Sequence, residues 1–194
     1  MTSGSDVTTD TRSQLRAVLT DLAGVVDRID DDSAPTPCTE YDVAALRTHV
    51  VGWLDTFADG FADPDGRAPR ADLTDYRAPD DAAGAIRAAA DRLDAALAGG
   101  AAARPLVLGG AGLPGDMALS MILWEYQVHG WDLATATGQP WNPAEAGLEA
   151  SLAFAPMMLT EDYQGEGKPF APRTPVADDA PPLERLVALS GRTP

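Results

Sequence analysis

The segment from Asp116 to Thr137 constrains the fold most, because as a helix it is apolar around nearly its whole circumference. At roughly 100° per residue, two apolar stripes lie on opposite sides of it. One stripe holds Met117, Met121, Trp124, Val128 and Trp131, and the other holds Leu119, Ile122, Leu123, Tyr126 and Leu133. A helix of this kind belongs in the interior of a protein, so other helices must surround it.

Three further segments carry apolar residues at helical spacing, and they supply the neighbours that a central helix needs. These segments run from Leu15 to Ile29, from Val43 to Phe61 and from Ile86 to Leu97. Thr39 and Asp42 form a helix start signal, which predicts that the second helix begins near residue 40. Two shorter helices are expected near the C-terminus, one beginning at Asn142-Pro143 and one over residues 183–189.

We therefore predict an all-α fold, a four-helix bundle with additional C-terminal helices packed alongside it. The Gly-rich segment 103–115 is expected to be a shaped loop, because one short strand cannot form a sheet. Residues 1–12 are mostly polar and are expected to be a flexible N-terminus, whereas residues 13–194 should form a single domain.

The charge of the chain restricts its partners. Among 194 residues, 30 are acidic and 14 are Lys or Arg, which gives a net charge of -16. A field of that sign repels phosphate backbones and anionic lipids, so we expect neither nucleic acid nor a membrane as partner. No apolar run approaches the roughly 20 residues of a membrane span, and the N-terminus lacks the apolar centre of a signal peptide. We expect a cytoplasmic monomer or homodimer that binds a small-molecule substrate.

Three polar residues on the apolar helix form a stripe of their own: Glu125, His129 and Asp132. Glu125 and His129 are four residues apart, so they lie one turn apart on the same face. An unpaired buried carboxylate is costly in free energy or loses its charge, so these side chains need partners. A simple ion pair between Glu125 and His129 is one such arrangement.

His49, the other of the two histidines, lies at the shoulder of the apolar stripe of the second helix. Gly52 and Thr56 beside it are small and are expected to leave room there. If the second and fourth helices adjoin, His49 can meet Glu125 and His129. Two neutral imidazoles and a carboxylate suit catalytic zinc, or Fe(II), Ni or Mn, with positions left for water or substrate. The alternative for each histidine is a hydrogen-bonded core residue.

Other side chains have two open interpretations each. Asp132 could orient a liganding imidazole, or it could pair with an arginine or cap a helix. Cys38 precedes the start of the second helix, but packing is favoured over a role as nucleophile. Arg104, Arg185 and Arg192 could grip an anionic substrate, although pairing with carboxylates is favoured in so acidic a protein.

Three segments carry a resemblance to a known family: TPCTEYDVAALRTHVVG, EYQVHGWDLATATGQP and LERLVALSGRTP. They resemble the actinobacterial metal-binding proteins of the DinB-like superfamily, specifically the group similar to the N-terminal domain of mycothiol-dependent maleylpyruvate isomerase. The resemblance implies a DinB-like four-helix bundle with a metal triad on His49, Glu125 and His129. Tyr41 stands where the family usually has tryptophan. We expect no counterpart of the isomerase's additional C-terminal domain, and therefore not all of its thiol and substrate contacts.

Three functional hypotheses follow. In the first, a divalent metal, preferably zinc, activates a low-molecular-weight thiol such as mycothiol for transfer to, or isomerisation of, a small electrophile. The thiol is implied by the resemblance alone. In the second, metal-bound water transforms a small molecule, with Asp132 as the general base. In the third, the bundle is a non-catalytic metal-binding or ligand-binding protein.

Overall fold

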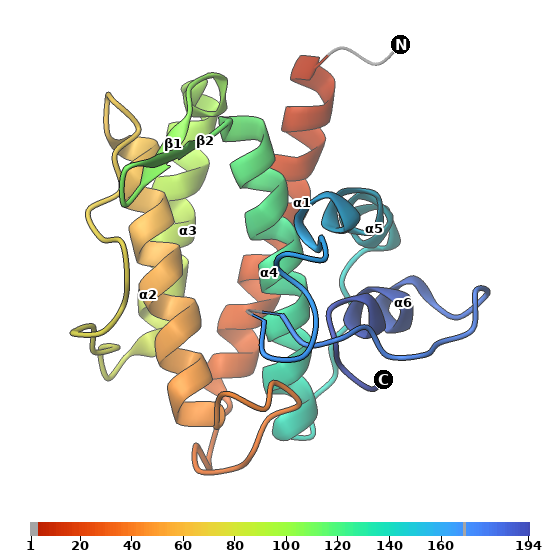
Figure 1. Ribbon diagram of the computed structural model, residues 1–194. Coiled ribbons are helices and arrows are strands. Elements are labelled where there is room, and N and C mark those ends of the chain that lie inside the picture. Colours follow the sequence, from red (N-terminus) through yellow and green to blue (C-terminus); the bar gives the residue numbers. More distant parts are fainter. Residues whose placement is uncertain (1–3, 169) are drawn as a thin grey trace.

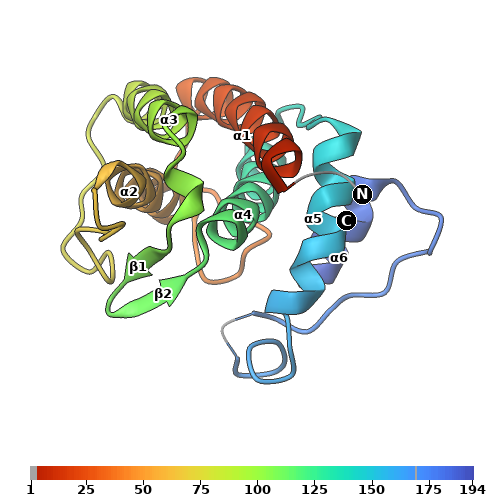
Figure 2. The ribbon, with the colours of Figure 1, turned by 90° about the horizontal axis from the view of Figure 1, so that it is seen from above.

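Four long helices build the bundle that the sequence predicts. The computed structural model describes residues 4–168 and 170–194. The helices are α1 (Gly4–Asp27), α2 (Val43–Ala62), α3 (Ala82–Ala98) and α4 (Gly115–Ala136). Viewed from above, α1 and α3 lie side by side, with α4 next to α1 and α2 next to α3 (Figure 2). The four helices therefore enclose one apolar core, and α2 and α4 are adjacent across it.

The central helix α4 is buried on nearly all sides, as its composition indicates. Leu119, Ile122 and Leu133 join the core of the bundle. Trp124 and Val128 instead pack into a second apolar cluster with α5 (Glu145–Met158) and α6 (Pro182–Leu189). The two C-terminal helices thus cover the outer side of α4, as Figure 1 shows. In the described part of the chain, no helix is long and apolar enough to cross a membrane.

The segment expected to be a loop is a β-hairpin, which corrects the sequence prediction. Strands β1 (Leu106–Leu108) and β2 (Ala111–Leu113) pair antiparallel. Gly109 and Gly110 between them both have positive φ, 55° and 92°, which allows a two-residue turn. The prediction failed because the second strand, Ala-Gly-Leu, has none of the β-branched or aromatic residues that mark strands. The hairpin is placed against α2, where Leu106 contacts Gly60.

Three helices begin elsewhere than predicted. Most of the segment 1–12, expected to be a flexible N-terminus, belongs to α1, and residues 1–3 lie outside the described part. Arg12, at the end of this segment, donates to Asp94 of α3 at 2.7 Å and so ties this part of α1 to the bundle. Helix α2 begins at Val43, since the side chain of Asp42, rather than Thr39, accepts from the helix backbone. Helix α5 begins at Glu145, after an extended Ala144.

Candidate metal centre

The two histidines of the chain meet between α2 and α4. The ring of His49 stands edge to face with the ring of His129, with centroids 5.1 Å apart and an angle of 72° between the planes. His129 is buried and His49 is half-buried. Residues 80 positions apart in the sequence are therefore in direct contact, because their helices are neighbours in the bundle.

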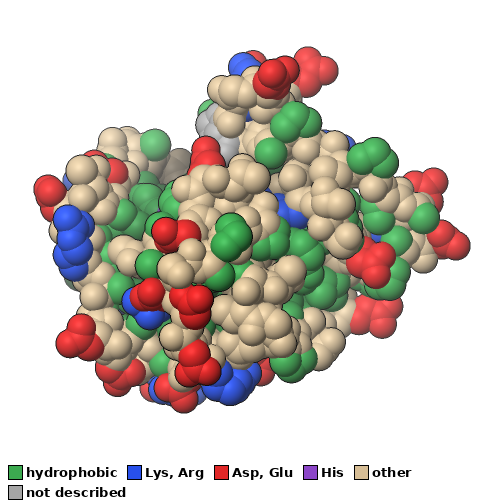
Figure 3. Space-filling view, turned by 90° about the horizontal axis from the view of Figure 1, so that it is seen from below, with side chains coloured by type: hydrophobic (Ala, Val, Ile, Leu, Met, Phe, Trp, Pro, Cys, Tyr) green, Lys and Arg blue, Asp and Glu red, His purple; other side chains and the backbone are tan. Residues whose placement is uncertain are grey.

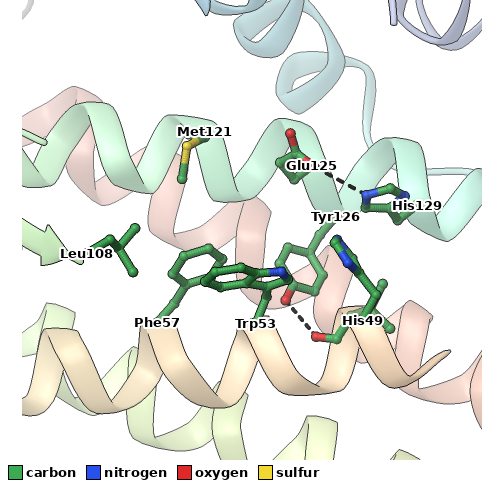
Figure 4. A pocket seen from close by; sticks show the side chains of 9 residues that line it. His49, Trp53, Phe57, Leu108, Met121, Glu125, Tyr126 and His129 are labelled. Atoms are coloured by element: carbon green, nitrogen blue, oxygen red, sulfur yellow. Dashed lines mark hydrogen bonds and ion pairs between the residues drawn. The ribbon is translucent and has the colours of Figure 1, made fainter. Parts of the chain in front are cut away.

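Glu125 completes the group. Its Oε2 lies 3.3 Å from Nε2 of His129, one helical turn away. All three side chains line a cavity of about 260 Å³ between α2 and α4. Figure 4 shows His49 reaching from α2 toward Glu125 and His129 on α4. The structure thus brings together the three residues that the sequence predicts as ligands.

A buried ion pair lies behind His129. Nδ1 of His129 is 3.2 Å from Oδ2 of Asp132, whose side chain is 0% exposed. Arg192, beyond the end of α6, donates to both oxygens of this carboxylate at 2.8 and 3.2 Å. Asp132 therefore does both things proposed for it, holding an imidazole and pairing with an arginine. Since Nδ1 is engaged, the Nε2 atom of His129 faces Glu125 and the cavity.

The surroundings set the charge of each group differently. Burial, together with the neighbouring His129, lowers the pKa of His49 to about 4, so its imidazole is neutral at neutral pH. Burial also opposes charge on His129, but hydrogen bonds to Asp132 and Glu125 outweigh it and raise the pKa of His129. In Asp132, hydrogen bonds from His129 and Arg192 outweigh burial and hold its pKa below the ordinary value.

The side chains of His49, Glu125 and His129 offer atoms of the kinds that divalent metals bind. Two imidazole nitrogens and one carboxylate oxygen at a cavity are the ligands of many catalytic zinc sites, and a carboxylate on the far nitrogen of a liganding histidine is the usual support. Within the described residues, no group of three or more His, Cys, Asp or Glu side chains is already arranged to hold an ion. In particular, Nε2 of His129 contacts Glu125 directly. To bind a metal ion, these side chains would have to move apart so that the ion could lie between them.

Comparison with known proteins places the chain in a family. Residues 13–134 match the family described as the mycothiol maleylpyruvate isomerase N-terminal domain. The chain belongs to this family. The matched region contains His49, Glu125, His129 and Asp132, but it ends before Arg192.

Relatives within this isomerase-domain family extend the similarity beyond the matched region. The chain is 34% identical over 173 residues to the uncharacterized proteins Rv0738 and MT0763, each from a strain of Mycobacterium tuberculosis. The alignment covers 86% of this chain and 87% of each relative. No solved structure matches the chain. These relatives carry no named activity.

On its other side, the triad borders a second and more polar cavity of about 190 Å³. Cys38, Glu40 and Arg192 line it together with the three triad residues. Burial raises the pKa of the Cys38 thiol, so it is less reactive than a free cysteine at neutral pH. This agrees with the packing role favoured from the sequence.

Several expectations about neighbouring residues need correction. Gly52 does not leave open space, because an added Cβ would lie 2.7 Å from the ring of Tyr76. Within the described residues, Arg104 does not pair with a carboxylate but donates to the carbonyl oxygens of Phe61 and Asp63 at 2.5 and 2.6 Å. The spacing of residues along the sequence cannot predict hydrogen bonds from a side chain to distant backbone carbonyl oxygens.

The other two arginines pair with carboxylates, as favoured from the sequence. Arg185 lies 3.3 Å from Glu149 at the surface, and Arg192 holds Asp132 inside. Sequence analysis considered Arg192 for binding an anion or pairing with a carboxylate, but it did not place Arg192 beside Asp132. The only signal for it was its place in the Gly-Arg-x-Pro end of the chain, which belongs to the resemblance.

Proposed function

We propose that this protein is a metal-dependent enzyme that activates a low-molecular-weight thiol, such as mycothiol, for transfer to or isomerisation of a small electrophile. Zinc is the preferred ion, ahead of nickel, iron or manganese. The observation that carries the proposal is the convergence of His49, Glu125 and His129 at one cavity. Membership of the mycothiol maleylpyruvate isomerase domain family supports the choice of thiol chemistry.

Each residue has a defined role in this proposal. His49, Glu125 and His129 would hold the ion, and a bound ion lowers the pKa of a coordinated thiol so that thiolate is present at neutral pH. Arg192 and Asp132 fix the ring of His129 so that Nε2 faces the cavity.

We assign Asp132 a positioning role instead of the general-base role considered from the sequence. Its carboxylate is fully buried, and both oxygens accept hydrogen bonds from Arg192. It does not line the cavity between α2 and α4. A water or substrate in that cavity would therefore meet Glu125 and the two imidazoles first.

Metal content tests the proposal. Protein purified without a nickel column and dialysed against zinc should hold about one ion per chain by mass spectrometry of the metal. His49→Ala and His129→Ala should lose it, whereas Glu149→Ala, a surface carboxylate on α5, should keep it. Asp132→Asn should keep the site but bind zinc about 10–100-fold more weakly. Full metal content in both histidine variants would refute the site.

Thiol dependence tests the chemistry separately. Zinc-loaded protein should bind mycothiol saturably, and metal-free protein should not. A panel of electrophiles should then be consumed only when both thiol and metal are present. Turnover with water alone would show a hydrolytic metalloenzyme and would overturn the thiol proposal while leaving the metal site intact.

A further inference from the structure

The cavity between α2 and α4 has two chemically different ends. The triad forms one end, and hydrocarbon forms the other. The apolar end is walled by Trp53 and Phe57 of α2, Leu108 of β1 and Met121 of α4. Figure 4 shows these four side chains extending the cavity from the histidines toward the hairpin. A molecule reacting at the triad would therefore place the rest of its body against these apolar walls.

The charges around this cavity disfavour an anion. Among the residues that line it, none is Lys or Arg, and Glu125 is the only carboxylate. Arg192 lines the other cavity and is already paired with Asp132. A carboxylate on the ligand body would lose its hydration without gaining a free cation, because His129 is already held by Glu125 and Asp132, and this loss is costly. The net charge of -16, with acidic side chains scattered over the face in Figure 3, adds to this repulsion.

The walls also leave few polar groups free to bind a ligand. The rings of Trp53 and Phe57 are stacked, with centroids 5.6 Å apart and 22° between their planes. The hydroxyl of Tyr126 donates to the carbonyl oxygen of Val50 at 2.7 Å, so its proton is already used. The apolar end therefore offers flat hydrocarbon surface, which fits an aromatic or alkenyl group.

We propose that the electrophile of this protein is an uncharged, apolar molecule with a flat body, bound with its reactive carbon at the triad and its body against Trp53, Phe57, Leu108 and Met121. This inference rests on the proposed function for the reaction itself. It departs from an anionic keto acid of the kind named in the family description. The cavity of about 260 Å³ limits the ligand to a small molecule.

An α,β-unsaturated ketone illustrates the chemistry. The thiol sulfur forms a bond to the β-carbon, the π electron pair of the C=C bond moves toward the α-carbon, and the α-carbon takes the proton that the thiol loses. All atoms of both reactants remain in the product, so no oxidant or reductant is needed. If the α-carbon is not yet protonated, rotation about the former double bond followed by return of the enolate electron pair re-forms the C=C bond, breaks the C–S bond and releases the thiolate, which gives isomerisation instead.

Binding to metal-free protein tests the inference without relying on the metal. Two probes share a styryl group: benzalacetone, an uncharged enone, and trans-cinnamate, a carboxylate. By calorimetry, benzalacetone should bind one site per chain at least tenfold more tightly than cinnamate. Equal affinities, a preference for cinnamate, or no saturable binding of benzalacetone would each overturn the proposal.

Matched variants on the hairpin locate the site. Leu108→Asp should weaken benzalacetone binding at least tenfold, because it places a carboxylate in the apolar end. Leu113→Asp is the matched control, because Leu113 on the other strand is also half-buried but does not line the cavity. This variant should bind benzalacetone with an affinity within twofold of wild type. In wild-type protein, nuclear Overhauser effects should join the styryl protons to the Met121 methyl group. Their absence, or unchanged binding by Leu108→Asp, would contradict the proposed location.

The two proposals fail in distinguishable ways. Benzalacetone binding with no zinc uptake would refute the metal-dependent function but would still support a cavity that binds uncharged ligands in preference to anions. Zinc uptake and thiol binding without benzalacetone binding would refute the substrate class alone.

Discussion

Loss of the Arg192 guanidinium should destabilise the fold far more than loss of a surface arginine. Asp132 is 0% exposed and Arg192 only 10%, and their nearest atoms are 2.8 Å apart. Arg192→Met keeps much of the aliphatic stem but leaves a buried carboxylate with only His129 beside it. Breaking a buried pair in this way costs about 3–5 kcal/mol, because the remaining carboxylate has neither water nor the guanidinium to balance its charge. Urea unfolding followed by circular dichroism measures this cost.

A double-mutant cycle separates the ion pair from general packing. Asp132→Asn removes the carboxylate charge, and the double variant removes both charges, so no unpaired ion remains. The double variant should therefore be more stable than the sum of the single losses predicts, by about 2 kcal/mol. Arg185→Met is the matched control, since its pair with Glu149 is 35% and 50% exposed and should contribute below about 1 kcal/mol. Additive losses, or equal losses in Arg192→Met and Arg185→Met, would refute the reasoning.

Three further predictions concern stability and use the same unfolding assay. Gly130→Ala should cost about 1–3 kcal/mol despite the better helix propensity of alanine, because the new Cβ would lie 2.1 Å from the Trp141 ring; a gain in stability would contradict this packing. The hydrogen bond from Arg12 lowers the pKa of Asp94 below its ordinary 3.8. The ionised Asp94 therefore stabilises the folded state above pH 3.8, and this stabilisation is lost as the pH falls through the pKa of the folded state. Asp94→Asn should accordingly reduce the loss of stability between neutral pH and about pH 3, and an unchanged pH profile would exclude the pair as its cause. Ser190→Ala should cost about 1–3 kcal/mol, because the buried indole nitrogen that donates to this hydroxyl at 2.9 Å loses its acceptor; wild-type stability would show that another acceptor replaces it.

The parts of the site that lie on one helix were predictable from the sequence. Helical spacing alone puts Glu125 and His129 one turn apart, and the apolar composition of the same helix places them inside. Joining His49 to them required one further assumption, that α2 and α4 are neighbours. The all-α bundle predicted from the periodicity has that arrangement.

The parts that depend on loops and the tail were not predictable. The hairpin that brings Leu108 to the cavity has strands of three residues, too short to give a periodic pattern. The backbone contacts of Arg104 depend on where the chain turns after α2, and no spacing rule specifies that. The same holds for Trp141, whose indole donates to the carbonyl oxygen of Gln127 and sits against Gly130.

The residues that follow α6 are part of the site. The tail is attached to α4 by two buried contacts, from Trp124 to Ser190 at 2.9 Å and from Arg192 to Asp132 at 2.8 Å. The Trp124–Ser190 hydrogen bond holds the end of α6 on the outer side of α4. The Arg192–Asp132 pair positions the carboxylate that contacts His129. The orientation of one predicted metal ligand, His129, therefore depends on Arg192, which lies 60 positions beyond the Asp132 that it holds. A bundle of α1 to α4 alone would keep the three donor side chains but would leave Asp132 without its cation.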